Sequence, residues 1–141
     1  MRKTALVTGM HTSLAYLVAE KLIKDGNMRV IAPVRVRESD RVDALIRNYG
    51  ENVIVSDFSP LDFQEAKELV AAADYILNLD FVGMPESEHF PDFAEKVNYF
   101  YTKNLVDAVI ETGSDAKIIE LSTTGIYGGR TMKRPYAAVG H

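Results

Sequence analysis

The chain has 141 residues, of which 47% are hydrophobic and 26% charged, with a formal net charge of −4 at pH 7. These values suit one soluble globular domain and give no indication of nucleic acid or a membrane as a partner. The absence of cysteine excludes disulfides and thiol chemistry and fits a cytoplasmic location, and the three scattered histidines lack metal-ligand spacing, so no metal is expected.

The first stretch of the chain predicts a strand, a sharp turn and a helix. Ala5, Leu6 and Val7 form an apolar run without alternation, as expected of a strand buried on both faces. Gly9 ends this run, and apolar residues then recur at helical spacing over residues 13–23. A helix that follows a buried parallel strand directs its free N–H groups to the carboxyl edge of the sheet. This turn is therefore a candidate phosphate site.

The glycine pattern of a dinucleotide-binding turn is only partly present here. The spacing G-x-x-G-x-x-G/A places its members at Gly9, Thr12 and Ala15. The alternative, with three residues between the first two glycines, uses Ser13 in the second place. The second position should lack a side chain, so that the backbone can approach a pyrophosphate. Thr12 and Ser13 could donate to a phosphate, or they could simply cap the helix.

The rest of the chain alternates strands with helices. Strands are expected at residues 28–34, 52–56, 74–79 and 117–121. The first of these should end near Ala32, because Pro33 is awkward in a paired strand. Helices are expected from residues 38–40 to Gly50, from Leu61 to Ala72 and from Asp92 to Thr112, with loops over 83–91 and 122–141. The longest helix has its apolar stripe at Phe93, Val97, Tyr101, Leu105, Ala108 and Val109.

This alternation predicts an α/β fold with a doubly wound parallel sheet of about five strands in the order 3-2-1-4-5. A binding crevice is then expected between strands 1 and 4, where the strand order reverses. The residues that follow the strands should gather at this crevice, and they are Gly9, Arg35, Asp57, Asp80, Ser122 and Thr123.

A basic residue stands where an acidic one would select NAD. Arg35 lies twenty residues beyond Ala15, with Arg37 close by. A guanidinium at this position binds the 2′-phosphate of NADP through paired hydrogen bonds. The sequence therefore favours NADP over NAD, and the alternative is a solvated basic edge of the sheet. Asp57 could accept a hydrogen bond from the adenine amino group, or it could cap the turn before Ser59.

Four stretches resemble the extended short-chain dehydrogenase/reductase family, of the NAD-dependent epimerase/dehydratase type. Residues 8–15 are similar to T-G-x-x-G-x-x-G, 55–57 to v-x-G-D, 97–106 to v-N-v-x-G-T-x-N-L-L, and 118–128 to strand 5 with S-[ST]-x-x-V-Y-G. The resemblance implies a Rossmann-like fold that is truncated relative to the family. Residues 1–141 would form a single NAD(P)-binding domain, and the substrate-binding domain would be absent.

The resemblance also assigns site residues. Thr123 takes the place of the hydroxyl that hydrogen-bonds the reacting oxygen of the substrate, and Asn98 that of an asparagine near the active site. The full set expected to contact the cofactor is Gly9, His11, Thr12, Ser13, Leu14, Arg35, Asp57, Phe58, Leu79, Asp80, Asn98 and Ser122.

Two departures from the family weaken the case for catalysis. After Thr123, the family's Tyr-x-x-x-Lys pair has no counterpart, since Tyr136 is followed four residues later by Gly140. Strand 4 leads into Asp80 and Phe81 where the family has small residues beside the nicotinamide.

The sequence therefore predicts the cofactor-binding domain of an epimerase, dehydratase or reductase that acts on a nucleotide sugar or small ketone. Dehydration is the least supported of these reactions, and the chain is not expected to be catalytically complete, so its being an enzyme stays open. The alternative is a non-catalytic nucleotide-binding or oligomerisation module. A homo-oligomer could form through the helix at 92–112.

Overall fold

A computed structural model describes residues 2–36 and 38–122. In chain order, the elements are β1 (Thr4–Thr8), α1 (Ser13–Lys24), β2 (Arg29–Pro33), α2 (Asp40–Tyr49), β3 (Val53–Ser56), α3 (Phe63–Ala71), β4 (Tyr75–Asn78), α4 (Glu86–His89), α5 (Pro91–Glu95), the π-helix η1 (Lys96–Phe100), α6 (Tyr101–Thr112) and β5 (Lys117–Glu120). The strands form one parallel sheet in the order β3-β2-β1-β4-β5, which confirms the predicted order and the Rossmann-like fold.

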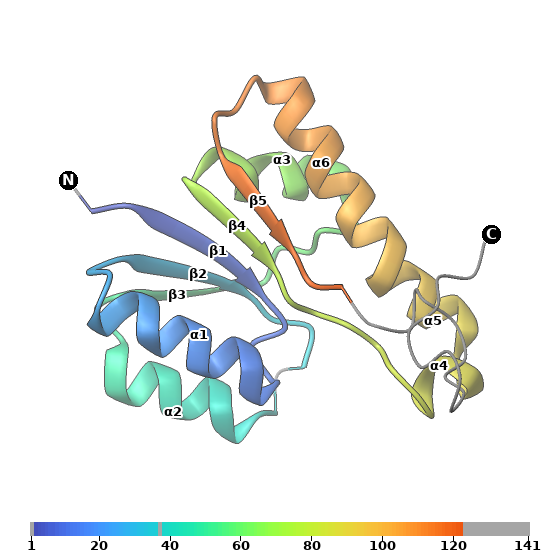
Figure 1. The fold of residues 1–141 in the computed structure, drawn as a ribbon, viewed down its shortest axis with the longest axis horizontal. Coiled ribbons are helices and arrows are strands. Elements are labelled where there is room, and N and C mark those ends of the chain that lie inside the picture. Colours follow the sequence, from blue (N-terminus) through green and yellow to red (C-terminus); the bar gives the residue numbers. More distant parts are fainter. Residues whose placement is uncertain (1, 37, 123–141) are drawn as a thin grey trace, which may run out of the picture.

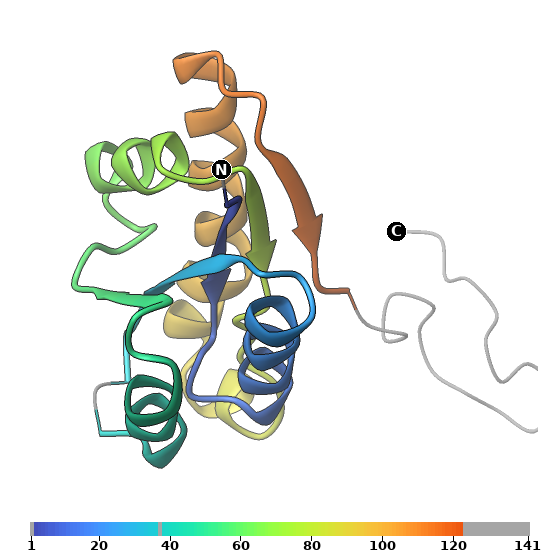
Figure 2. The same cartoon turned by 90° about the vertical axis from the view of Figure 1, so that its left-hand side faces the viewer.

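Helices cover both faces of the sheet (Figures 1 and 2). Helices α1 and α2 lie on one face, and α3 and α6 lie on the other. Strand β1 is the centre of the core, and Ala5, Leu6 and Val7 have no exposed surface. Because side chains alternate along a strand, Ala5 and Val7 join the core under α1, whereas Leu6 packs among α3 and α6. Burial of Leu6 alone contributes about 2 kcal/mol to folding.

Strand β2 runs one residue further than the sequence predicts. Pro33 is its last residue and pairs with Ser56 of β3. The pairing of β1 with β2 has already ended at Ile31. Proline has no N–H to donate, but at this position β1 no longer pairs with β2, so no hydrogen bond between these two strands is lost. Pro33 is therefore tolerated as the last residue of β2.

The segment before β5 differs from prediction in two ways. The loop expected over residues 83–91 contains the short helix α4. The long helix is divided into α5, η1 and α6, and it starts at Pro91, which suits a first helical position. A π-turn advances the chain by more residues per turn than an α-helix. The buried stripe begins at Ala94 and not at Phe93, which is 38% exposed.

Candidate functional site

The carboxyl ends of all five strands lie at the same edge of the sheet, because the strands are parallel. The chain leaves this edge at Gly9 after β1, at Arg35 after β2, at Asp57 after β3 and at Asp80 after β4. Ser122 follows β5 and is exposed. The topology thus places the predicted site residues from different strands along one edge.

The turn after β1 is held against the exit of β4. Gly9 has φ +81°, and a Cβ built on it would lie 2.9 Å from both the Cα and the backbone N of Asp80. The Thr8 hydroxyl accepts hydrogen bonds from the N–H groups of Leu79 and Asp80, both at 3.0 Å. Gly9 is therefore required both by its backbone conformation and by the lack of space for a side chain.

Thr12 caps helix α1. Its hydroxyl donates to the Gly9 carbonyl at 2.7 Å and accepts from the Ala15 N–H at 3.3 Å. Of the two roles that the sequence left open for Thr12, the observed contacts are those of a cap. The amides of Ser13 and Leu14 precede the first intrahelical bonds, and both residues are exposed. These two amides can therefore bind an anion.

His11 lies in the same turn among charged neighbours. Its backbone carbonyl accepts a hydrogen bond from Arg41 at 3.2 Å. Burial lowers the pKa of the His11 imidazole, Asp80 and Glu86 oppose this shift, and Arg35 adds to it. His11 is thus favoured in its neutral form beside the carboxyl ends of β1 and β4.

An ion pair crosses the carboxyl end of β1. Arg35 Nε donates to Asp80 Oδ2 at 2.7 Å, and Arg35 Nη2 donates to Oδ1 at 2.9 Å. The Asp80 side chain is 2% exposed and that of Arg35 21%. Burial opposes the charge on Arg35, but the hydrogen bonds and charge of Asp80 raise the pKa of the guanidinium above its ordinary value. The guanidinium also lies 5.0 Å from the centroid of the Phe93 ring, a cation–π distance.

A small recess lies between the ends of β2 and β3. It measures about 40 Å³, and Arg35, Asp57, Phe58 and Tyr101 are among its lining residues. Asp57 and Phe58 are exposed, as an adenine site at this position requires. Burial raises the pKa of Tyr101, the charge of Asp80 adds to the rise, and Arg35 and a hydrogen bond with Ser59 oppose it. A planar ring could enter here only if side chains of the recess moved.

Asn98 holds the loop that follows β4. Its Oδ1 accepts from the Val82 N–H at 2.8 Å, and its Nδ2 donates to the Val82 carbonyl at 2.9 Å. This paired contact fixes the loop to η1. The structure therefore gives Asn98 a role in positioning the loop beside Asp80. Two further residues considered from sequence, Arg37 and Thr123, lie outside the described residues.

A polar network next to Thr8 was not anticipated from the sequence. Thr8 Oγ1 donates to Asn78 Oδ1 at 2.7 Å. Asn78 Nδ2 in turn donates to Thr102 Oγ1 at 3.1 Å and to Glu120 at 3.0 Å. Asn78 stands in an otherwise apolar strand and is 1% exposed. A buried side-chain amide requires hydrogen-bond partners. Asn78 is therefore the feature of the sequence that could have indicated this network.

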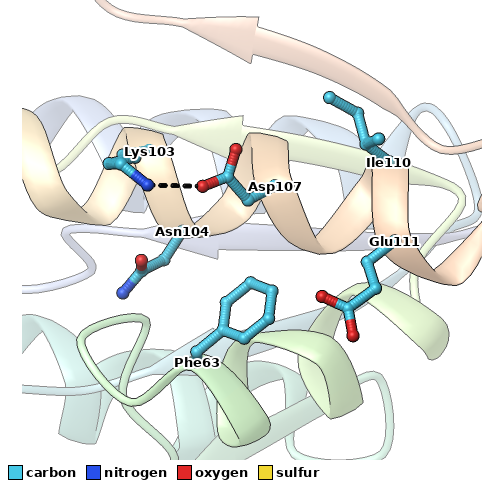
Figure 3. Close-up of a pocket in the computed structure, with 6 residues that line it drawn as sticks. All are labelled: Phe63, Lys103, Asn104, Asp107, Ile110 and Glu111. Atoms are coloured by element: carbon cyan, nitrogen blue, oxygen red, sulfur yellow. Dashed lines mark hydrogen bonds and ion pairs between the residues drawn. The ribbon is translucent and has the colours of Figure 1, made fainter.

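A groove beside α6 lies away from the strand ends (Figure 3). It runs between α3 and α6, with Phe63 on one side and Lys103, Asp107 and Ile110 on the other. An ion pair between Lys103 and Asp107 at 2.6 Å crosses one turn of α6. No predicted site residue lines this groove.

Two further findings concern the described part of the chain. No group of three or more His, Cys, Asp or Glu side chains there is arranged to hold a metal ion. None of the helices over residues 2–36 and 38–122 has the length and apolar character needed to cross a membrane.

No family model matches the sequence, and no curated protein matches it. Solved structures do match. A UDP-glucose-4-epimerase from Stenotrophomonas maltophila, with bound NAD and formylated UDP-arabinopyranose, is 20% identical, with a TM-score of 0.80 over 99% of this chain and 43% of that one. A UDP-glucose 4-epimerase from Bifidobacterium longum, in complex with NAD+ and UDP, is 23% identical, with a TM-score of 0.74 over 89% of this chain and 38% of that one.

A short-chain dehydrogenase from Streptomyces avermitilis is 20% identical, with a TM-score of 0.68 over 96% of this chain and 54% of that one. The chain thus spans between 38% and 54% of the length of these neighbours. At such identities the likeness establishes a shared fold. These neighbours are named as two UDP-glucose 4-epimerases and one short-chain dehydrogenase. Both names agree with the family that the four sequence motifs resemble.

Proposed function

We propose that this chain binds a nicotinamide dinucleotide at the carboxyl edge of its sheet. The observation that carries the proposal is the Gly9 turn, which leads into α1 at the point between β1 and β4 where the strand order reverses. The amides of Ser13 and Leu14 would receive the pyrophosphate, and the recess beside Asp57 would receive the adenine. The NAD-bound epimerases that share the fold support the same ligand class.

The proposed reaction class is the oxidation or reduction of a carbon that carries oxygen, in a nucleotide sugar or a small ketone. The nicotinamide, when bound, accepts or supplies a hydride. Thr123 would hold the reacting oxygen through its hydroxyl. The proton that this oxygen loses or gains needs an acid–base group, and residues 124–141 contain no Tyr-x-x-x-Lys pair for it. We therefore propose a cofactor-binding domain that does not turn over substrate by itself, in a cytoplasmic setting.

A calorimetric titration with NADP and NAD tests this function. Binding of either dinucleotide with loss of affinity in Gly9→Ala supports the proposal. Absence of binding by both, in a chain shown to be folded by circular dichroism, refutes it. The finer expectation is that NADP binds more tightly than NAD, because Arg35 can bind the 2′-phosphate. Arg35→Ala should then weaken NADP more than NAD, with the NAD affinity as the internal control.

A second candidate function is a non-catalytic module that associates through the 92–112 segment. Exposed apolar side chains favour it, since Ile110 is 72% exposed, Tyr99 53% and Val106 36%. Sedimentation at several concentrations tests this candidate. A dimer that Ile110→Lys converts to a monomer supports it, and a wild-type monomer at all concentrations refutes it.

A further inference from the structure

The ion pair between Arg35 and Asp80 occupies the middle of the proposed cofactor site. Arg35 follows β2 and Asp80 follows β4, and β1 with the Gly9 turn lies between these two strands. The pair therefore spans the crevice from one side to the other. Both oxygens of the carboxylate are bound by the guanidinium, at 2.7 and 2.9 Å.

The two partners differ in how firmly they are held. The Asp80 backbone N–H is bound by the Thr8 hydroxyl, and its Cα lies close against Gly9. Its carboxylate is almost fully buried, with 2% exposure. Arg35 has a longer side chain, which is 21% exposed and rests on the Phe93 ring. Asp80 is thus the fixed partner, and Arg35 is the partner that can turn toward a ligand.

A phosphate that recruits Arg35 must compete with this carboxylate. Asp80 fills the edge of the guanidinium formed by Nε and Nη2, so a phosphate could make paired hydrogen bonds only with the edge formed by Nη1 and Nη2. Withdrawal of Arg35 would leave a buried charge without its partner, which is strongly unfavourable. A phosphate that joined the pair would instead place a second anion beside Asp80 and be repelled.

We infer that Asp80 is a specificity-determining residue: an internal carboxylate that occupies Arg35 and limits the affinity of this site for the 2′-phosphate of a dinucleotide. The inference rests on the proposed function for the identity of the ligand. The competition between Asp80 and an anion for Arg35 depends only on the observed ion pair between Arg35 and Asp80.

Asp80→Asn is the test variant, because it removes the charge and keeps the shape. Asp107→Asn is the matched control, since it makes the same change in the exposed ion pair with Lys103 on α6. The ligands are adenosine 2′,5′-bisphosphate and adenosine 5′-monophosphate, which differ only in the 2′-phosphate.

Asp80→Asn should raise the affinity for the bisphosphate by about tenfold and change that for the monophosphate by less than about threefold. Asp107→Asn should change neither affinity. An Asp80→Asn protein that binds both nucleotides as the wild type does would overturn the inference. The gain should also disappear in the double variant Arg35→Lys/Asp80→Asn, and a gain that persists there would show that Arg35 is not the group involved.

A second substitution, Asp80→Ser, decides the matter if Asp80→Asn does not fold. It also removes the charge, and it should give a similar gain in affinity for the bisphosphate; a folded Asp80→Ser protein that binds both nucleotides as the wild type does would overturn the inference. The NMR signal of the Arg35 Nε–H group, which reports whether an anion displaces Asp80, should move further on bisphosphate binding in the variant than in the wild type.

Failure of the proposed function gives a different result from failure of the inference. If the wild type binds neither nucleotide, NAD nor NADP, the dinucleotide proposal fails. Inorganic pyrophosphate is then the probe. A shift of the Arg35 signal in Asp80→Asn that is absent in the wild type retains the competition, and no shift in either protein rejects it.

Discussion

Gly9→Ala should destabilise the chain by more than a positive φ alone can explain. Alanine in the left-handed region costs about 1–2 kcal/mol. At Gly9 the new Cβ would also lie 2.9 Å from the Cα and N of Asp80, and these are backbone atoms that cannot rotate away. Overpacking of this kind costs about 1–3 kcal/mol. The sum is a loss of about 2–5 kcal/mol in the free energy of unfolding.

Gly113→Ala is the matched control for this change. Gly113 has φ +65° at the end of α6, and a Cβ there would meet no atom within 4 Å. It therefore carries the conformational cost without the overlap. The effect of alanine on the unfolded chain is the same at both positions and cancels in the comparison. We expect a loss of about 1–2 kcal/mol for Gly113→Ala.

Urea denaturation followed by far-ultraviolet circular dichroism measures both losses, which suits a chain with no tryptophan. The difference between the two variants reports the contact between the Gly9 turn and the exit of β4. Equal losses would refute the reasoning, because they would mean that the turn after β1 is not held against Asp80.

Three other changes test the same region. Arg35→Ala should cost about 3–5 kcal/mol, since it leaves the Asp80 carboxylate buried without its partner. The double variant with Asp80→Ala should recover most of this loss in urea denaturation, and a full loss in the double variant would contradict the explanation. Asn98→Ala should cost about 2 kcal/mol and speed hydrogen exchange at the Val82 amide, and unchanged exchange would be inconsistent with the two bonds. The native pKa of His11 lies below the unfolded value, so the unfolded chain binds this proton more readily and stability should fall as pH drops through about 6.5. His11→Gln should reduce the fall between about pH 7 and 5.5, and an identical fall in both proteins would exclude His11 as its source.

The sequence alone determined the order of the sheet and the edge at which the candidate site residues gather. Short apolar runs such as 5–7, bounded by turn residues, are typical of buried strands in an α/β alternation, and right-handed crossovers leave few strand orders for five of them. The residues that follow parallel strands must then meet at one edge. For the same reason, the positions of Gly9, Arg35 and Asp80 directly after their strands are enough to assign them to that edge.

Only the tertiary structure decided how these residues are engaged. Arg35 and Asp80 are 45 positions apart, and their positions along the chain indicate two separate contacts to a cofactor. Their pairing depends on side-chain reach across β1, which no local pattern encodes. The contact between Asn98, in the π-turn, and the Val82 backbone likewise joins residues 16 positions apart. Local periodicity determines which residues are buried, whereas the partner of a buried charge is determined by three-dimensional proximity.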